Sequence, residues 1–170
     1  ELLPDYMRFL RGVIDTDELP LNISREVTQS SPLITKIRNI VTGKVLTLLE
    51  DWAQNDKEKY DNFYKSWGSL FKTGLNSDFA NKERLTELVR YETSGLDKGK
   101  MKSLKEYVAS MQEEQKDIFY LMGDSRELIE RNPNLEYFRK KGIEVIYLWD
   151  PVDVFTFHYI QVYDGKTIKS

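Results

Sequence analysis

The chain has 170 residues, of which 40% are hydrophobic and 31% are charged, and its formal net charge at pH 7 is −3. This composition is typical of a folded protein with a charged surface, and it gives no basic footprint for nucleic acid. The sequence has no cysteine, which excludes disulfides and thiolate chemistry, and no apolar run approaches the roughly 20 residues of a membrane helix.

The first part of the chain predicts a short helical opening followed by a strand within residues 2–14. The stretch DELPLNISREVTQ comes next, at residues 17–29. Pro20 favours extended backbone before it, and Asn22 and Ser24 are suited to cap the start of a helical turn.

Arg25 and Gln29 are four residues apart, so they share one face of that predicted turn. A guanidinium, an amide and the free N–H groups of a helix start together suit an anionic oxygen, with phosphate as the obvious candidate. The alternative is that Arg25 only forms a solvated surface pair with Glu26, which would contribute little.

Helical periodicity is clear from Pro32 to about Ala53. The apolar face of this helix is predicted at Leu33, Ile37, Ile40 or Val41, Lys44 or Val45, Leu48 and Trp52. Further helices are predicted over 57–70 and 82–89, the first with a core-facing aromatic stripe of Tyr60, Phe63, Tyr64 and Trp67 and the second buried through Leu85, Leu88 and Val89. A polar loop is expected over 72–81, and the three helices form one helical unit.

The second half of the chain begins with a predicted linker over 94–100. Ser103 and Glu106 form a capping box for a short helix. Buried strands are predicted over 117–123 and 143–150. Between them lie a helix capped by Asp124 or Ser125 and a helix from Asn132-Pro133 to Gly142. A strand–helix–helix–strand order predicts two parallel strands.

Candidate chemistry outside the 17–29 stretch is sparse. His158 is the only histidine and is expected to be packed or half-exposed, so neither a catalytic triad nor a zinc site is expected. Asp15, Asp17 and Glu18 are expected to form a solvated acidic turn. The lysines at 98, 100, 102 and 105 are expected to form a solvated face, because no aromatic platform for bases accompanies them.

Several stretches resemble the heat-shock protein 90 chaperone family. RFLRGVIDTDELPLNISREVTQ (8–29) is similar to that family's middle-segment signature, and DFANKERLTELVRYETS (78–94) is most similar to its bacterial branch, high-temperature protein G. SLKEYVASMQEEQKDIFYLMGDS (103–125), residues 138–148, Asp150, Val152, Asp153 and the DGK at 164–166 extend the resemblance over essentially the whole chain.

The resemblance implies the later part of the middle segment, as a piece of a longer chaperone. With the patterns above it predicts an α/β (α+β) chain: a helical bundle-like unit, then a small three-layer αβα subdomain with a short parallel sheet. The expected divisions are 1–31, the truncated end of a first α/β subdomain with the Arg25 loop; 32–93, a helical connector; and 94–170, the small subdomain. The many β-branched and aromatic residues of 152–163 favour a strand, whereas the resemblance implies a helix from Asp153 to about Tyr159 followed by a strand.

In that family an arginine reaches from the middle segment to the γ-phosphate of ATP in the N-terminal domain, and a glutamine assists it. Carried over to this sequence, Arg25 is the γ-phosphate contact, Gln29 supports it, and Asn22 and Ser24 shape the loop. Thr28 stands where the family usually has leucine, which removes an apolar anchor from the loop.

The resemblance also implies a cytoplasmic stress protein that binds unfolded clients and works with the N-terminal ATPase domain of the same chain. ATP with Mg²⁺ would serve the full-length protein, which would dimerise through a C-terminal domain absent here. The isolated chain is expected to hydrolyse no ATP, to hold no cofactor or metal, and to bind neither nucleic acid nor membrane.

Two alternatives differ in class. The chain could be a stand-alone protein-interaction module in which Arg25 is structural. It could also be a small-molecule enzyme, which predicts a pocket at the ends of the two buried strands, near Gly123-Asp124 and Trp149-Asp150.

Overall fold

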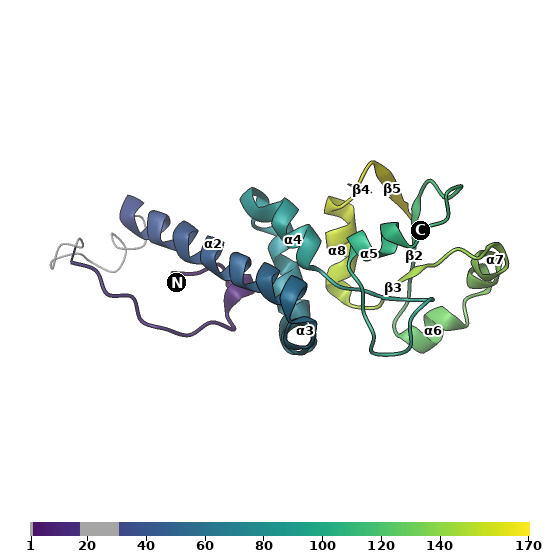
Figure 1. Ribbon diagram of the computed structural model, residues 1–170, viewed down its shortest axis with the longest axis horizontal. Helices are drawn as coiled ribbons and strands as arrows, with labels where there is room; N and C mark the ends of the chain where they lie inside the picture. Colours follow the sequence, from purple (N-terminus) through teal and green to yellow (C-terminus); the bar gives the residue numbers. More distant parts are fainter. Residues whose placement is uncertain (1, 18–30) are drawn as a thin grey trace. The chain divides into compact units, whose positions relative to one another are not determined.

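The computed structural model describes residues 2–17 and 31–170. The chain divides into two compact units, residues 1–74 and 75–170, which are described separately below. The division into segments 1–31, 32–93 and 94–170 stays a prediction. Figure 1 shows the elements that the two units contain.

The first unit is built on two long helices, α2 (Pro32–Asn55) and α3 (Lys57–Lys72), joined at a single residue. That residue, Asp56, accepts a hydrogen bond from the Lys59 backbone N–H and so caps α3. Both predicted helices are confirmed, and each extends two residues further than expected. Asp56 alone is enough to separate them, because a capping side chain replaces the backbone acceptors that a helix start lacks.

An aromatic core lies between α3 and a short 3-10 helix, η1 (Asp5–Met7). Tyr6 is fully buried, and its ring packs edge-on against Phe71 at 5.9 Å between centroids. Phe9 packs in the same way against Phe63 at 5.0 Å. Within the predicted stripe, Tyr60 and Tyr64 are buried but Trp67 is 42% exposed, so the stripe only partly faces the core.

The strand expected within residues 2–14 is absent from the described residues 2–17, where the only regular element is η1. Residues 11–15 are exposed and lack the strand partner that a ladder requires. The prediction of a strand here is therefore wrong for this chain. The helical opening is confirmed by η1.

The buried face of α2 differs from the predicted one. Thr42, Leu46 and Leu49 are buried, whereas Leu48 is half exposed. The helix is apolar over more than one face, and packing against α3 rather than periodicity selects the buried side.

The second unit begins with two short elements, η3 (Phe79–Asn81) and α4 (Lys82–Leu88). The stretch 72–81 is not the polar loop that the sequence suggested, because it also holds the 3-10 helix η2 (Thr73–Asn76), and Leu75 within it is completely buried. Leu85, Leu88 and Val89 are buried as predicted.

Among the described residues, a five-stranded sheet runs in the order β1-β3-β2-β5-β4. Its strands are β1 (Glu92–Thr93), β2 (Ile118–Met122), β3 (Ile146–Leu148), β4 (Val162–Tyr163) and β5 (Lys166–Lys169). β2 is parallel to both β3 and β5, and the edge strands β1 and β4 are antiparallel to their neighbours. The predicted parallel pair is confirmed, within a mixed sheet.

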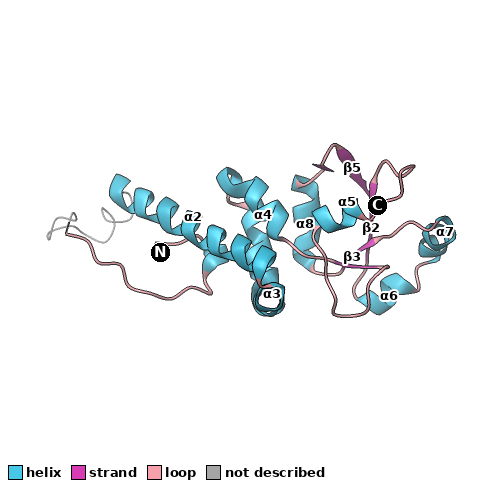
Figure 2. Cartoon of the chain, in the orientation of Figure 1, coloured by secondary structure: helices cyan, strands magenta, loops and turns pink. Residues whose placement is uncertain are grey.

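Helices cover both faces of this sheet, as Figure 2 shows for β2 and β3 between α8 (Pro151–Tyr159) and the pair α6 (Arg126–Glu130) and α7 (Pro133–Lys141). One face forms a core cluster with α6 and α7, made of Leu121, Ile129, Leu135, Val145 and Tyr147. On the other face the ring of Tyr120 lies 5.1 Å from that of Phe157 in α8. The mixed α/β class and its αβα layering are confirmed.

Local signals placed the helices of this unit correctly. Ser103 and Glu106 form a complete capping box for α5 (Leu104–Ala109). Asn132 caps α7, which ends at Gly142 in the left-handed conformation. The helix over 151–159 and the strand after it follow the resemblance, and Asp150 caps that helix through the Val152 N–H.

Residues 94–100, predicted as a linker, lie inside the second unit. The Ser94 N–H donates to the Val145 carbonyl, and the Val145 N–H donates to the Ser94 hydroxyl. These bonds hold the turn onto the sheet.

Candidate functional site

The predicted phosphate site falls on residues 18–30. Asn22, Ser24, Arg25, Gln29 and the divergent Thr28 therefore lie outside the described residues. The helix that follows is in place: α2 begins at Pro32, with Ser31 extended before it. The geometry of the Arg25 loop stays a prediction.

Arg126 is the centre of a charged cluster that sequence reasoning missed. Its guanidinium bonds the Glu92 carboxylate, donates to Glu130 Oε1 at 2.8 Å and to the Leu96 carbonyl at 2.7 Å, and stacks over the Tyr147 ring. The residue is only 8% exposed. Burial alone would lower the pKa of Arg126, but its hydrogen bonds to the two carboxylates raise it above its ordinary value. All four of these contacts are internal, so the cluster ties the 92–96 turn to α6 and β3.

Glu144 gathers a second internal network. Lys102 Nζ lies 2.9 Å from its carboxylate, the Thr93 hydroxyl donates to it, and the Ser110 hydroxyl does so at 3.1 Å. The Tyr107 hydroxyl donates to the Glu144 backbone carbonyl at 2.6 Å, and burial raises the pKa of Tyr107. This carboxylate is held by its neighbours and is poorly placed for acid–base work.

Lys102 therefore does not belong to the predicted solvated lysine face, because its side chain is mostly buried. Lys98 does behave as predicted. It forms an exposed ion pair with Glu127, and the hydrogen bond from Lys98 lowers the pKa of Glu127.

The ends of the parallel strands have little room for a small-molecule pocket. A Cβ added at Gly123 would lie 2.8 Å from Ile129 Cγ1, so Ile129 already fills that space. The Asp150 and Ser125 side chains are used as helix caps. Within residues 2–17 and 31–170, no group of three histidine or acidic side chains could hold a metal ion. The Gly123–Ile129 contact and the two helix caps leave little room for the pocket that the small-molecule-enzyme alternative predicts at this place.

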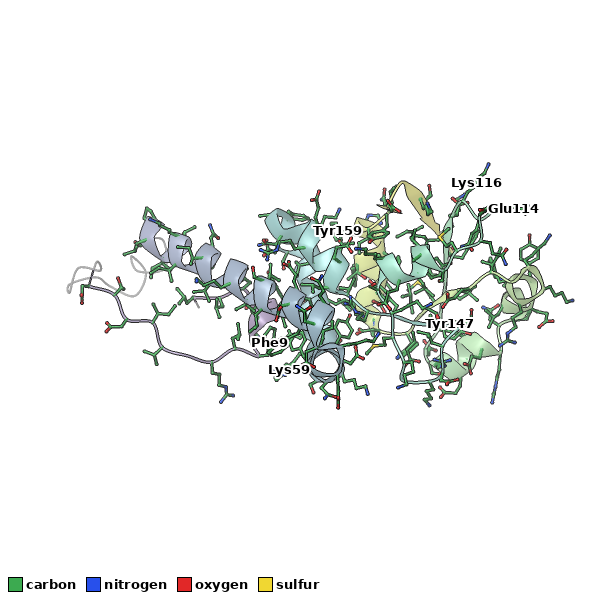
Figure 3. The ribbon with its side chains drawn as sticks, viewed as in Figure 1. Phe9, Lys59, Glu114, Lys116, Tyr147 and Tyr159 are labelled. Carbon is green, nitrogen blue, oxygen red and sulfur yellow. The ribbon has the colours of Figure 1, made fainter. Side chains whose placement is uncertain are left out.

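The clearest candidate for an interaction surface is the outer side of α8. Val154, Phe155 and Tyr159 are 53%, 61% and 38% exposed, and Phe79 of η3, 63% exposed, packs its ring 5.9 Å from that of Tyr159. These four residues are called the α8 face below. Figure 3 labels Tyr159 within it. Exposed apolar side chains gathered on one element mark a surface suited to an apolar partner.

The rest of α8 is firmly held, which keeps this face outward. Phe157, on the buried side, packs against Tyr91 and Tyr120. Lys82 Nζ of α4 donates to the Tyr159 carbonyl at 2.7 Å, and the Tyr163 hydroxyl after the helix donates to Glu87 Oε1 at 2.7 Å. The sequence predicted this helix but could not give the direction of its faces, because apolar residues occur on both.

His158 lies at an exposed position among the residues of the α8 face, so of the two expected environments the packed one is excluded. Its ring packs edge-on against that of Tyr159 at 6.0 Å. Among the described residues, none of the helices is both long and apolar enough to cross a membrane.

Comparison with known proteins identifies a family to which this sequence is similar. The profile of the family described as "Hsp90 protein" matches residues 1–170. The chain is 51% identical over 170 residues to "Chaperone protein HtpG" of Chlorobium phaeovibrioides and 49% identical to that of Chlorobaculum tepidum. It is 42% identical to the protein of the same name from Geobacter sulfurreducens.

These alignments cover all of the chain but only 27%, 27% and 26% of the three relatives, so the chain spans about a quarter of their length. The match nevertheless extends over every residue of the chain. The chain therefore belongs to the Hsp90 family.

Proposed function

We propose that this chain is the later part of the middle segment of an ATP-dependent cytoplasmic chaperone of the bacterial type. The observation that carries the proposal is the family match over residues 1–170, with relatives named as chaperones. In the full-length protein the segment would link the nucleotide state of another domain to the binding of client proteins. Homodimerisation would be a property of the remaining chain.

Arg25 is the proposed link to ATP, with Gln29 in support and Asn22 and Ser24 shaping the loop. An arginine supplied by a second domain offsets the charge that develops on the transferring phosphoryl oxygens. Because it arrives only when the domains close, hydrolysis follows closure. In this proposal the nucleotide and its Mg²⁺ are bound by the N-terminal domain of the full-length chaperone.

The test is the steady-state ATPase rate of the full-length chaperone with Arg25→Ala. Losing a charge contact made in the transition state should lower turnover by about 10²-fold while ATP affinity stays nearly the same. Arg131→Ala, at an exposed arginine of the second unit, is the matched control and should leave turnover unchanged.

Unchanged turnover in the Arg25→Ala protein would favour the alternative of a stand-alone interaction module, in which this arginine is structural. A loss of ATP affinity together with turnover would instead assign Arg25 to ground-state binding of the nucleotide.

The α8 face is the proposed contact for clients, through apolar segments of non-native polypeptides. Its support is the exposure of three large apolar side chains on α8 and of Phe79 beside them, while Lys82 and Tyr120 hold the helix in place. Aromatic side chains, phenylalanine included, are enriched at protein interfaces, and Phe155 is the most exposed aromatic residue of α8.

Binding of a capped apolar peptide to the full-length protein tests this assignment. Phe155→Ser should weaken the affinity by about tenfold, as expected for loss of one central aromatic contact. Leu128→Ser, at an exposed apolar residue of α6, is the control. Equal affinities in all three proteins would remove the α8 face from client binding.

A further inference from the structure

The α8 face holds one ionisable group that can change charge near neutral pH. The sequence has one histidine and no cysteine, so His158 is the only side chain of the chain whose type ordinarily titrates between pH 5 and 8. It is exposed, and it lies between Phe155 and Tyr159 in sequence, on the same turn of the helix.

We propose that His158 makes the α8 face pH-sensitive, so that apolar segments bind tightly when its imidazole is neutral and weakly when it is protonated. The inference rests on the proposed client contact. To that contact it adds a condition, namely that a client binds the face when the imidazole of His158 is neutral.

The physical reason is desolvation. A neutral imidazole can be covered by an apolar segment at modest cost, whereas covering a cation removes its hydration without replacing it. The imidazole of His158 packs edge-on against the Tyr159 ring, with an interplanar angle of 82°. A cation formed here would therefore lie in the middle of the surface that the client must cover.

The charged groups around α8 do not favour a second cation at its end. Lys82 of α4 already donates to the Tyr159 carbonyl and so occupies the negative end of the helix dipole. Glu87 of α4 is bonded to the Tyr163 hydroxyl, and Asp153 lies on the buried side of α8 itself. Tyr91 and Tyr120 contact the helix through Phe157, and phenols ordinarily titrate near pH 10, outside this range.

The sign follows from linkage. If the bound state disfavours the protonated form, binding is strongest above about pH 6.5 and weakens as the pH falls below it. Because the complex favours the neutral imidazole, binding is expected to be about five- to tenfold weaker at pH 5.5 than at pH 8.

The experiment measures binding of the full-length protein to a fluorescent, acetylated and amidated peptide of leucine, phenylalanine, serine and glycine, which has no titratable side chain. Wild type should lose five- to tenfold in affinity between pH 8 and pH 5.5. His158→Gln should remove that difference, and His158→Lys should bind weakly at both pH values. Circular dichroism at both pH values checks that each protein stays folded.

A parallel loss of affinity in wild type and His158→Gln would overturn the inference, since the titrating group would then lie elsewhere. So would tight binding by His158→Lys. The two proposals fail separately. If Phe155→Ser binds as well as wild type, the client contact itself is wrong, whereas if Phe155→Ser weakens binding and His158→Gln leaves the pH dependence intact, only the role of His158 is wrong.

Discussion

Arg126 joins its own helix to a turn that lies 30 to 34 residues earlier in the sequence. It bonds Glu92 of β1, the Leu96 carbonyl and Glu130 one turn along α6. A buried guanidinium is tolerated because its donors have acceptors and its flat face lies on Tyr147. The same arrangement leaves Glu92 dependent on it, since that carboxylate is also mostly buried.

Arg126→Ala should therefore lower the free energy of unfolding by about 3 kcal/mol, because it leaves a buried carboxylate without its cation. Urea denaturation measures this. Lys98→Ala, which breaks an ion pair whose side chains are 74% and 53% exposed, should lower the free energy of unfolding far less, because solvent screens exposed charges. Equal losses of unfolding free energy in the two variants would mean that burial does not determine how much each ion pair contributes to stability.

Gly74 is a second position where a single atom matters. A Cβ there would lie 2.9 Å from Cγ of the fully buried Tyr6 ring, whereas a Cβ at Gly12 would meet nothing within 4 Å. Gly74→Ala should destabilise the chain by about 1–3 kcal/mol through overpacking. Gly12→Ala is the control. Thermal or urea unfolding of the two variants measures the difference in stability. An unchanged midpoint for Gly74→Ala would show that the Tyr6 ring can move aside.

At the scale of elements, a hydrogen bond from the side chain of Tyr163 connects β4 to α4. The Tyr163 hydroxyl donates to Glu87, and burial first, then that carboxylate, raises the pKa of Tyr163 well above its ordinary value. A raised pKa means that the neutral form is favoured in the folded state. The neutral Tyr163 side chain therefore contributes fully to the stability of the folded protein below about pH 10, the pH at which tyrosine titrates in the unfolded chain. This contribution is lost as the pH rises further.

Tyr163→Phe should accordingly lose less stability than wild type between pH 8 and pH 10.5. The two proteins are compared by urea midpoint at each pH. The buried Tyr107 contributes in the same direction and remains in both proteins, so the difference isolates residue 163. Identical midpoint shifts would place the alkaline sensitivity elsewhere.

Elements with local signals could be predicted from the sequence, and those decided by packing could not. The Ser103 capping box and the Asn132 cap lie within a few residues of the helices they start, so the sequence contains the whole signal. The buried side of α2 depends on α3, and the burial of Lys102 depends on Glu144, 42 residues away. The Arg126 and Glu144 networks were missed for the same reason, and the Arg25 site stays a prediction.

For the whole molecule, the two compact units offer a test of independence. Gly74→Ala changes packing within the first unit and Arg126→Ala changes it within the second. If each unit has its own core, hydrogen exchange should quicken in α2 and α3 for the first variant and in β2 and β3 for the second. Exchange that quickens throughout in both variants would instead indicate one cooperative unit.

The order of strands in the sheet has a consequence for the growing chain on the ribosome. β2 is the central strand, yet the partner on one of its sides, β5, follows it by about 50 residues, with Ile118 opposite Ile168. At roughly 5–20 residues per second, translation leaves that side of β2 open for about 3–10 s. During that interval this segment of a proposed chaperone would itself present an unpaired strand edge. It would then be as prone to non-native strand pairing as the client chains that it is proposed to assist.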